Sequence, residues 1–259
     1  MNSNLSPSDR RSKIVNIIRQ CNRVSVEELA QTLNISRETI RRDLTVLARV
    51  GMVQKFHGGA SLPTITGEGA FRDRLGENVA EKVRIATEAV KIIAPSETLF
   101  IDTGSTTLYF AEKLTSVSDL TVITNSAEIA RTISLSSTQT KTFLLGGEFN
   151  GDNRQTVGSL AISQIRSFRA HHAILTIGAL DSRTGIMDFS IDEAQIAKAM
   201  ITQAESVTIL ADSSKFERIA SFEVCSLEQV TNLVCDHPPG DALKAILIDA
   251  GVNIIHVPL

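Results

Sequence analysis

Arginines at helical spacing in residues 36–49 could bind the edges of DNA bases. At about 100° per residue, the apolar and polar side chains of this segment fall on opposite faces of a helix. The apolar face carries Ile40, Leu44 and Leu47, and the polar face carries Glu38, Arg41, Arg42, Thr45 and Arg49. An arginine can donate two hydrogen bonds to O6 and N7 of guanine in the major groove. The same pattern also fits an ordinary solvated helix face, which is the alternative interpretation.

The residues around this helix predict a winged helix-turn-helix. Residues 25–33 repeat apolar side chains at i, i+3, i+4 and i+7, the spacing of a second, shorter helix. Ser25 and Glu28 have the spacing of a capping box, Asn34 suits a tight turn, and Ser36 can cap the arginine-bearing helix. A further helix over residues 8–21 precedes them, and paired glycines at 58 and 59 indicate a hairpin after them. The predicted DNA-binding residues are Ser25, Ser36, Arg37, Glu38, Thr39, Arg41, Arg42, Thr45, Arg49, Lys55 and His57.

Basic residues are concentrated in the first 61 residues of the chain. This part holds ten Lys and Arg against five Asp and Glu, a net charge of +5. The totals of 26 and 29 leave sixteen basic and twenty-four acidic residues for the remainder, a net charge of −8. A basic segment attracts phosphate and an acidic one is repelled by it. The charge distribution therefore favours nucleic-acid binding by the N-terminal part alone.

From residue 80 onward, short apolar runs alternate with helical segments. This alternation predicts an α/β domain with a mainly parallel sheet covered on both faces. The predicted strands lie at 98–102, 121–124, 142–145, 173–179, 207–212, 233–236 and 254–257, and the helices at 81–93, 106–115, 126–134, 158–168, 191–205 and 240–250. Ligands of such sheets bind at the carboxyl ends of the strands.

The loop after the first of these strands is a candidate anion site. Its residues are Asp102, Thr103, Gly104, Ser105, Thr106 and Thr107. A glycine among hydroxyls just before a helix lets backbone N–H groups, hydroxyls and the helix dipole converge on a phosphate. Lys215, after the fifth strand, would add a positive charge. The alternative is a plain strand–helix turn with a Ser or Thr cap. The sequence contains neither a P-loop nor a dinucleotide-binding fingerprint.

Residues 39–60, TIRRDLTVLARVGMVQKFHGGA, resemble the N-terminal signature of DeoR-family bacterial transcription regulators. The rest of the chain resembles the sensor domain of that family, which is similar in fold to ribose-5-phosphate isomerase and binds phosphorylated sugars or polyols. The resemblance implies a repressor of a carbohydrate or polyol operon, released from operator DNA by a phosphorylated effector. It assigns residues 102–107 to the phosphate and Asp181, Glu193 and Lys215 to the sugar end. The effector-binding set implied by strand ends and resemblance together is Asp102, Thr103, Gly104, Ser105, Thr106, Thr107, Asn125, Gly146, Gly147, Asp181, Glu193 and Lys215.

The alternative function is a catalytically active sugar-phosphate isomerase with a DNA-binding head. Glu193 could act as a base near a carbonyl if burial poises it, although it could equally be an ordinary acid on a helix surface. The isomerase carries a lysine in a glycine-rich loop between the positions matched by Asp181 and Glu193. Residues 182–192 of this chain read SRTGIMDFSID and contain no lysine. The sequence therefore favours a regulator that is not an enzyme and that needs no cofactor.

The remaining composition is that of an ordinary globular chain. Cys21, Cys225 and Cys235 are odd in number and lack metal-type spacing, so we expect small buried hydrophobic residues. The adjacent His171 and His172 would point to opposite faces of a strand, so we expect no metal site. The sequence shows no signal-peptide pattern and no apolar run of membrane-spanning length, which predicts a cytoplasmic protein.

Residues 61–78 predict a linker, because they combine Pro63 and three glycines with no sustained period. The expected domains are a winged helix-turn-helix over 1–60 and a sensor domain over 79–259. We expect a homodimer or homotetramer that places two heads on a palindromic operator or on repeated half-sites. Effector binding would favour one quaternary arrangement and lower operator affinity. Three-, five- and six-carbon phosphates all remain open as effectors.

Overall fold

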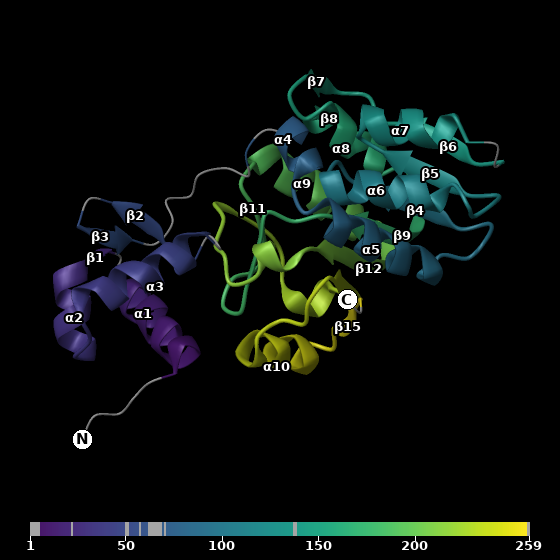
Figure 1. Ribbon diagram of the computed structural model, residues 1–259. Helices are drawn as coiled ribbons and strands as arrows, with labels where there is room; N and C mark the ends of the chain where they lie inside the picture. The colour runs from purple at the N-terminus through teal and green to yellow at the C-terminus, as the bar shows by residue number, and fades with distance from the viewer. Residues whose placement is uncertain are drawn as a thin grey trace. The chain divides into compact units, whose positions relative to one another are not determined.

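The computed structural model describes residues 6–21, 23–49, 52–56, 58–61, 69, 71–136 and 139–257. The chain divides into two compact units, Met1–Thr66 and Gly67–Leu259. Each unit is described by itself below (Figure 1). His57 and residues 62–68 and 70 of the predicted linker lie outside the described residues, as does the side chain of Arg49. The domain limits at residues 60 and 78 stay a prediction.

The described residues of the N-terminal unit form three helices and a small antiparallel sheet. Its elements are α1 (Pro7–Cys21), β1 (Arg23–Ser25), α2 (Val26–Leu33), α3 (Arg37–Arg49), β2 (Gln54–Phe56) and β3 (Gly59–Ser61). The strand order is β1-β3-β2, with Arg23 and Gln54 both opposite Ser61. The elements form the predicted winged helix-turn-helix, with β2 and β3 as the wing.

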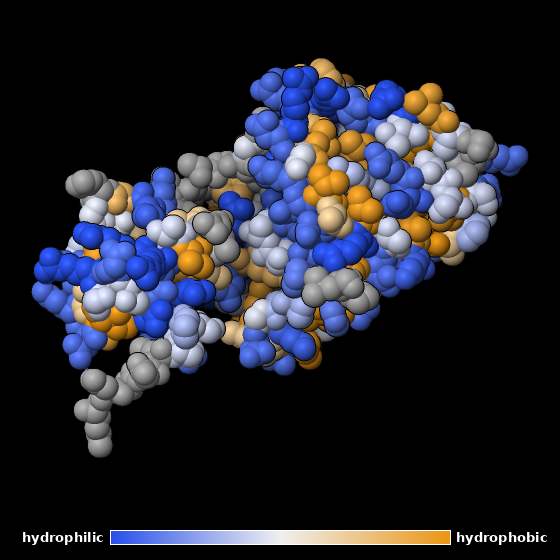
Figure 2. All heavy atoms as spheres, viewed as in Figure 1, coloured by the Kyte–Doolittle hydropathy of each residue, from blue (hydrophilic) through white to orange (hydrophobic). Residues whose placement is uncertain are grey.

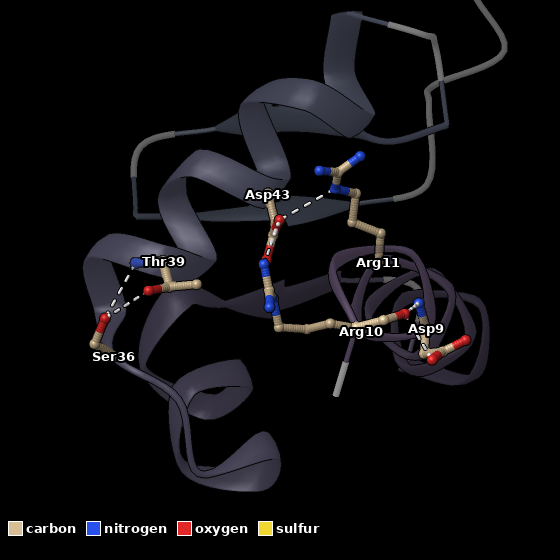
Figure 3. Close-up of polar contacts among 7 residues, drawn as sticks. Asp9, Arg10, Arg11, Ser36, Thr39 and Asp43 are labelled. Carbon is tan, nitrogen blue, oxygen red and sulfur yellow. Dashed lines mark hydrogen bonds and ion pairs between the residues drawn. The ribbon is translucent and has the colours of Figure 1, made fainter. Parts of the chain in front are cut away.

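Local residues determine where α2 and α3 begin and end. The Ser25 hydroxyl accepts from the backbone N–H of Glu28, and the Glu28 carboxylate accepts from the N–H of Ser25. Asn34 ends α2 in the left-handed conformation, with φ of 53°. Ser36 Oγ accepts from the N–H of Thr39 at 3.2 Å and so caps α3 (Figure 3). All three predicted helix boundaries are confirmed.

The core of the N-terminal unit is formed by the apolar faces of the three helices. Ile14, Ile18, Leu29, Ile40 and Leu44 are at most 1% exposed. Hydrophilic residues dominate the viewed surface of this unit (Figure 2). One expectation is wrong here, because Cys21 at the end of α1 is exposed, whereas Cys225 and Cys235 are buried.

The C-terminal unit is built around a seven-stranded parallel sheet with the order β15-β14-β12-β9-β4-β5-β6. Its strands are β4 (Thr98–Ile101), β5 (Thr121–Thr124), β6 (Lys141–Leu144), β9 (Ala170–Leu175), β12 (Ala204–Ala211), β14 (Asn232–Cys235) and β15 (Asn253–His256). Its helices are α4 (Phe71–Gly76), α5 (Val79–Ala89), α6 (Ser105–Leu114), α7 (Ala127–Ser134), α8 (Ser159–Ile165), α9 (Ile191–Ile201) and α10 (Asp241–Asp249), with short 3₁₀ turns η1 (Val90–Ile92), η2 (Ser213–Lys215) and η3 (Leu227–Gln229).

Helices cover both faces of this sheet (Figure 1). Alternate strand residues face opposite layers, so Leu99 and Ile101 pack with α5, α6 and α7 while Phe100 packs with α8, α9 and α10. On the viewed face, hydrophobic residues lie between hydrophilic ones (Figure 2). No helix in the described part of the chain has the length and apolarity needed to cross a membrane. The predicted sheet and its two helical layers are confirmed.

The short antiparallel strands were not predicted. β7 (Glu148–Asn150) pairs with β8 (Gln155–Val157), and β10 (Ala179–Asp181) pairs with β11 (Gly185–Asp188), which pairs with β13 (Phe222–Cys225). The predicted strand 173–179 is also wrong at its end, because β9 stops at Leu175 and Ala179 begins another strand. The predicted helix 191–205 stops at Ile201, and Ala204 already belongs to β12. Helix α4 lies inside the stretch predicted to be a linker.

Candidate functional sites

The polar face of α3 is a solvent-exposed surface that carries two described arginines. The side chains of Arg41 and Arg42 are 65% and 81% exposed, and Glu38 lies 4.0 Å and 3.4 Å from them. Such exposed ion pairs contribute little to stability, so both guanidinium groups can exchange Glu38 for another acceptor. Ile40, Leu44 and Leu47 are buried on the opposite face, as predicted. Arg49 continues the same helix.

The wing contacts this face of α3. Lys55 Nζ on β2 donates to Thr45 Oγ1 at 3.0 Å, and Thr45 Oγ1 donates to the carbonyl of Arg41 at 2.8 Å. An ion pair between Arg37 and Glu27 joins the start of α3 to α2. The predicted residues Ser25, Ser36 and Thr39 act here in caps, so their observed contacts are structural. The polar face of α3 and Lys55 therefore form one continuous basic surface.

An ion-pair cluster between α1 and α3 was missed by sequence reasoning. Asp43 is 3% exposed and accepts from Nε and Nη2 of Arg10 at 2.5 and 3.2 Å, and from Nε of Arg11 at 3.2 Å. These hydrogen bonds raise the pKa of Arg10. Figure 3 shows both arginines reaching across from α1 to the carboxylate. Asp43 lies in sequence beside the arginines of the polar face, and no local pattern distinguishes it.

A small pocket lies at the carboxyl ends of the central strands in the C-terminal unit. Its lining residues follow β4, β5 and β9 or lie on α4, α9 and the short strands β8 and β11. The lining residues are Arg74, Asp102, Thr103, Asn125, Gln155, Thr176, Asp188, Glu193, Ile196 and Ala197. The pocket thus brings together four predicted residues, Asp102, Thr103, Asn125 and Glu193.

Asp102 is the buried carboxylate at the end of β4. Both of its oxygens accept from the N–H of Thr176, at 3.1 and 3.0 Å. Burial raises the pKa of Asp102 well above its usual 3.8, and the charges of Glu193 and Asp188 raise it further, against the lowering effect of the Thr176 hydrogen bonds. Asp102 therefore takes up a proton more readily than a solvent-exposed aspartate does.

Amide side chains hold Glu193 toward the pocket. Its carboxylate accepts from Asn153 Nδ2 at 2.5 Å and from Gln155 Nε2 at 2.6 Å, while its N–H is capped by Ser190. Gln155 Oε1 in turn accepts from Asn125 Nδ2 at 3.1 Å. Glu193 is thus part of an ordered network, unlike a plain surface acid of a helix.

Oγ1 of Thr103 and Oδ1 of Asn125, both in the lining, have no hydrogen-bond partner within the described residues, and both residues are more than nine-tenths buried. A buried polar atom without a partner costs free energy, and such atoms in a pocket point to a ligand or water that satisfies them.

Other predicted effector residues have structural contacts and do not line the pocket. Thr107 Oγ1 donates to the carbonyls of Asp102 and Gly104, and Ser105 and Thr106 are buried at the start of α6. A Cβ at Gly104 would lie 2.2 Å from Thr176 Oγ1, so in this structure the glycine makes room for Thr176. The sequence pattern instead predicted a phosphate beside this glycine.

The glycines after β6 and the carboxylate of β10 also have other partners. The N–H of Gly146 donates to Gln164, and Gly147 has a φ of 155° with no space for a Cβ beside Val157. Asp181 is buried, and its carboxylate accepts from the N–H of Arg183. None of these three residues lines the pocket.

Lys215 lies in the turn η2 that follows β12. Its charge is near enough to Lys82 to lower the pKa of that amine, although burial of Lys82 is the larger cause and Asp212 opposes it. Asp212 caps η2 through the N–H of Ser214 and accepts from Asn78 at 3.3 Å. Lys215 therefore belongs to a neighbouring charged cluster rather than to the pocket lining.

Sequence reasoning missed four polar residues of the pocket: Arg74, Gln155, Thr176 and Asp188. Thr176 directly follows β9, so a correct end for that strand would have found it. Gln155 and Asp188 lie on β8 and β11, which were not predicted. Arg74 lies on α4, in the stretch interpreted as a linker.

A winged helix-turn-helix with an exposed basic helix, joined to an α/β unit with a polar strand-end pocket, defines a DNA-binding regulator with a sensor domain. Residues 10–66 match the DeoR-like helix-turn-helix domain, and residues 77–237 match the DeoR C terminal sensor domain. The chain belongs to the DeoR family of transcriptional regulators.

The chain matches several regulators along almost their whole length. It is 31% identical to the HTH-type transcriptional repressor CsqR of Escherichia coli, covering 97% of this chain and 96% of the relative. It is 31% identical to the Glycerol-3-phosphate regulon repressor of E. coli, covering 96% and 99%, and 30% identical to the HTH-type transcriptional regulator GolR of Listeria innocua, covering 96% and 98%. These relatives confirm the prediction of a regulator over an enzyme.

A solved structure of ribose 5-phosphate isomerase A from Methanocaldococcus jannaschii has a TM-score of 0.41 with this chain, at 17% identity. The match covers 55% of this chain and 57% of the isomerase chain.

Proposed function

We propose that this protein is the repressor of a carbohydrate or polyol operon and that a phosphorylated sugar or polyol releases it from operator DNA. Helix α3 reads the operator through Arg41, Arg42 and Arg49, and Lys55 of the wing contacts the backbone. The effector occupies the strand-end pocket of the C-terminal unit. This places the protein in the cytoplasm, with the operator.

The mixed chemistry of the pocket is the main support for the proposed class of effector. Carboxylates and amides, among them Asp102, Glu193 and Asn125, suit the hydroxyl groups of a sugar or polyol. A phosphate cannot face these carboxylates without a cation. Arg74 in the lining and Lys215 nearby are the cations available to it, and the N-terminus of α6 adds its dipole. A molecule with one anionic end and one hydroxylated end meets both conditions.

The relatives support this class, because one is named for the glycerol 3-phosphate regulon. The proposal also includes a homodimer or homotetramer, because two DNA-binding domains on one operator bind with higher affinity than a single one. Effector binding then lowers operator affinity by the difference in its affinity for the DNA-bound and free arrangements.

Thermal denaturation with a panel of three- to six-carbon phosphates tests the proposal. The panel includes glycerol 3-phosphate, ribose 5-phosphate and fructose 6-phosphate, each paired with its unphosphorylated parent. We expect at least one phosphate, and no parent, to raise the midpoint of unfolding, because binding to the native state stabilises it. The same compound should reduce operator binding in gel shifts. A protein that responds to no phosphorylated member contradicts the proposal.

Lys215→Ala tests the neighbouring cation. Loss of a charge-assisted contact costs about 1.5–3 kcal/mol, so effector affinity should fall by a factor of about 10 to 100 while operator binding is kept. Lys91→Ala, which removes an exposed charge from the same unit, is the control. Equal effector affinity in both variants would remove Lys215 from the site.

A further inference from the structure

Arg74 is the only basic residue among the described residues that line the strand-end pocket. Its side chain is buried, and its guanidinium carbon lies 5.8 Å from the ring centre of Phe71, which is itself 1% exposed. A guanidinium in the lining places a positive charge beside the pocket, and arginine binds phosphate oxygens through two parallel hydrogen bonds.

Two independent atoms point to a ligand in the same pocket. Oγ1 of Thr103 can donate to an oxygen, and Oδ1 of Asn125 can accept from a hydroxyl. Both are buried without a partner. A donor, an acceptor and a buried cation together match the anionic and hydroxylated ends of one molecule.

Helix α4, which carries Arg74, is attached to the pocket side of the unit by several hydrogen bonds. Lys82 Nζ donates to the carbonyls of Arg74 and Glu77 at 2.5 and 2.7 Å. Tyr109 on α6 donates to the carbonyl of Leu75 at 3.0 Å. The backbone of α4 is thus tied to α5 and α6, and α6 begins at the loop that follows Asp102.

We propose that Arg74 binds the anionic group of the effector and that α4 thereby transmits effector occupancy to the connector of the DNA-binding domain. This inference rests on the proposed function and names its sensing residue. Among the described residues, α4 is the first helix after β3, so a shift of α4 would move one end of the segment that leads to the DNA-binding domain. A ligand that binds Arg74 stabilises one position of α4 relative to the strand ends.

Calorimetric titration of Arg74 variants tests the first half of this inference. The probe is the panel phosphate with the largest thermal shift on the wild type, with inorganic phosphate as a second probe. We expect Arg74→Gln to weaken binding of the panel phosphate at least tenfold and Arg74→Lys to weaken it less, because lysine keeps the charge but not the fork. Arg72→Gln is the matched control, since Arg72 is an exposed arginine on the same helix that does not line the pocket.

The outcomes separate this inference from the proposed function. If no panel phosphate raises the unfolding midpoint of the wild type, the proposed function and the inference about Arg74 are both contradicted. If the wild type responds and Arg74→Gln binds with unchanged affinity, Arg74 is not the anion ligand and only the inference falls. The melting curve of each variant without ligand shows whether it is folded, and Arg74→Lys serves if Arg74→Gln is not.

Amide hydrogen exchange tests the second half. Adding the same phosphate should slow exchange in residues 71–78 of the wild type and of Arg72→Gln, but not of Arg74→Gln. Lys82→Met, which removes both carbonyl contacts, should keep phosphate binding within a few fold and reduce the effect of phosphate on operator affinity. Slowed exchange confined to the strand ends, with α4 unaffected in the wild type, would contradict transmission through α4.

Discussion

Asp43 on α3 accepts two hydrogen bonds from Arg10 on α1, so the helix that carries Arg41 and Arg42 is fixed to α1 of its own domain. Arg11 adds a third bond to the same carboxylate. Two of the basic residues in the N-terminal unit therefore have a structural partner. The positive charge available to DNA is correspondingly smaller than the residue count suggests.

Asp43→Asn should destabilise the N-terminal unit by about 2 kcal/mol, in the range of hydrogen bonds to charged groups. The variant loses the charge of an almost fully buried acceptor and leaves Arg10 with a weaker partner. Denaturant unfolding followed by helix content measures the loss. Arg10→Gln should cost more than Arg11→Gln, because the side chain of Arg10 is 17% exposed and that of Arg11 is 36% exposed. The reverse order would show that the bidentate pair is not the main contact.

Arg41→Ala and Arg42→Ala should each weaken specific operator binding by roughly 1–3 kcal/mol, the scale of one good base contact. Arg49→Ala should act through phosphate and reduce the salt slope of binding by about one. Gel shifts at several salt concentrations measure both quantities. Lys91→Ala removes an equal charge from the C-terminal unit and should leave operator binding unchanged. Wild-type affinity in all three arginine variants would exclude α3 as the recognition helix.

Gly104→Ala should destabilise the C-terminal unit by about 1–3 kcal/mol, as overpacking of a filled site does. The added Cβ would meet Oγ1 of Thr176 at 2.2 Å and Cγ2 at 2.9 Å. Thermal denaturation of the single variant and of Gly104→Ala with Thr176→Ala measures the effect, and the second change should restore part of the loss. No rescue would mean that the glycine is required for something other than space for Thr176.

The stability of the wild type relative to Asp102→Asn should fall as pH rises. The pKa of Asp102 is raised in the folded state, chiefly by burial, so folding favours its protonated form. Its stabilising contribution is complete below the ordinary pKa of 3.8 and is lost as pH rises through the raised value. Urea unfolding of both proteins from about pH 4 to about pH 8 measures the difference, with a slope of up to about 1.4 kcal/mol per pH unit. A flat difference would contradict the shift.

The parts of the fold that were predicted correctly depend on local signals. Ser25 with Glu28, and Asn34, act within one helix turn, so their spacing alone predicts the ends of α2. The inner strands of the main sheet, β4, β5, β9, β12 and β14, are largely buried and read as apolar runs, whereas the edge strands β6 and β15 are mostly exposed. β7 and β8 have only three residues each, and β7 is exposed, so neither length nor hydrophobicity distinguishes them from a loop.

The pocket was predicted only where strand ends reveal it. Asp102 and Asn125 follow β4 and β5 directly, and parallel strands bring their carboxyl ends to one edge. Arg74 could not be found in this way, because α4 has six residues and is held by the burial of Phe71 and by contacts from Lys82 and Tyr109. Those contacts depend on tertiary packing, which helix propensity and hydrophobic periodicity do not predict.

The strand order of the main sheet has a consequence for synthesis on the ribosome. The sheet of the N-terminal unit is complete once Ser61 pairs with Arg23. The central strand β4 gains its second neighbour only after β9 has been synthesised, because Leu99 pairs with His172. Long loops delay such pairing, and domains near the N-terminus fold first. A nascent chain therefore contains a complete N-terminal unit while the strands of its C-terminal unit still have unpaired edges. Those edges make this intermediate the species of the protein most open to misassembly.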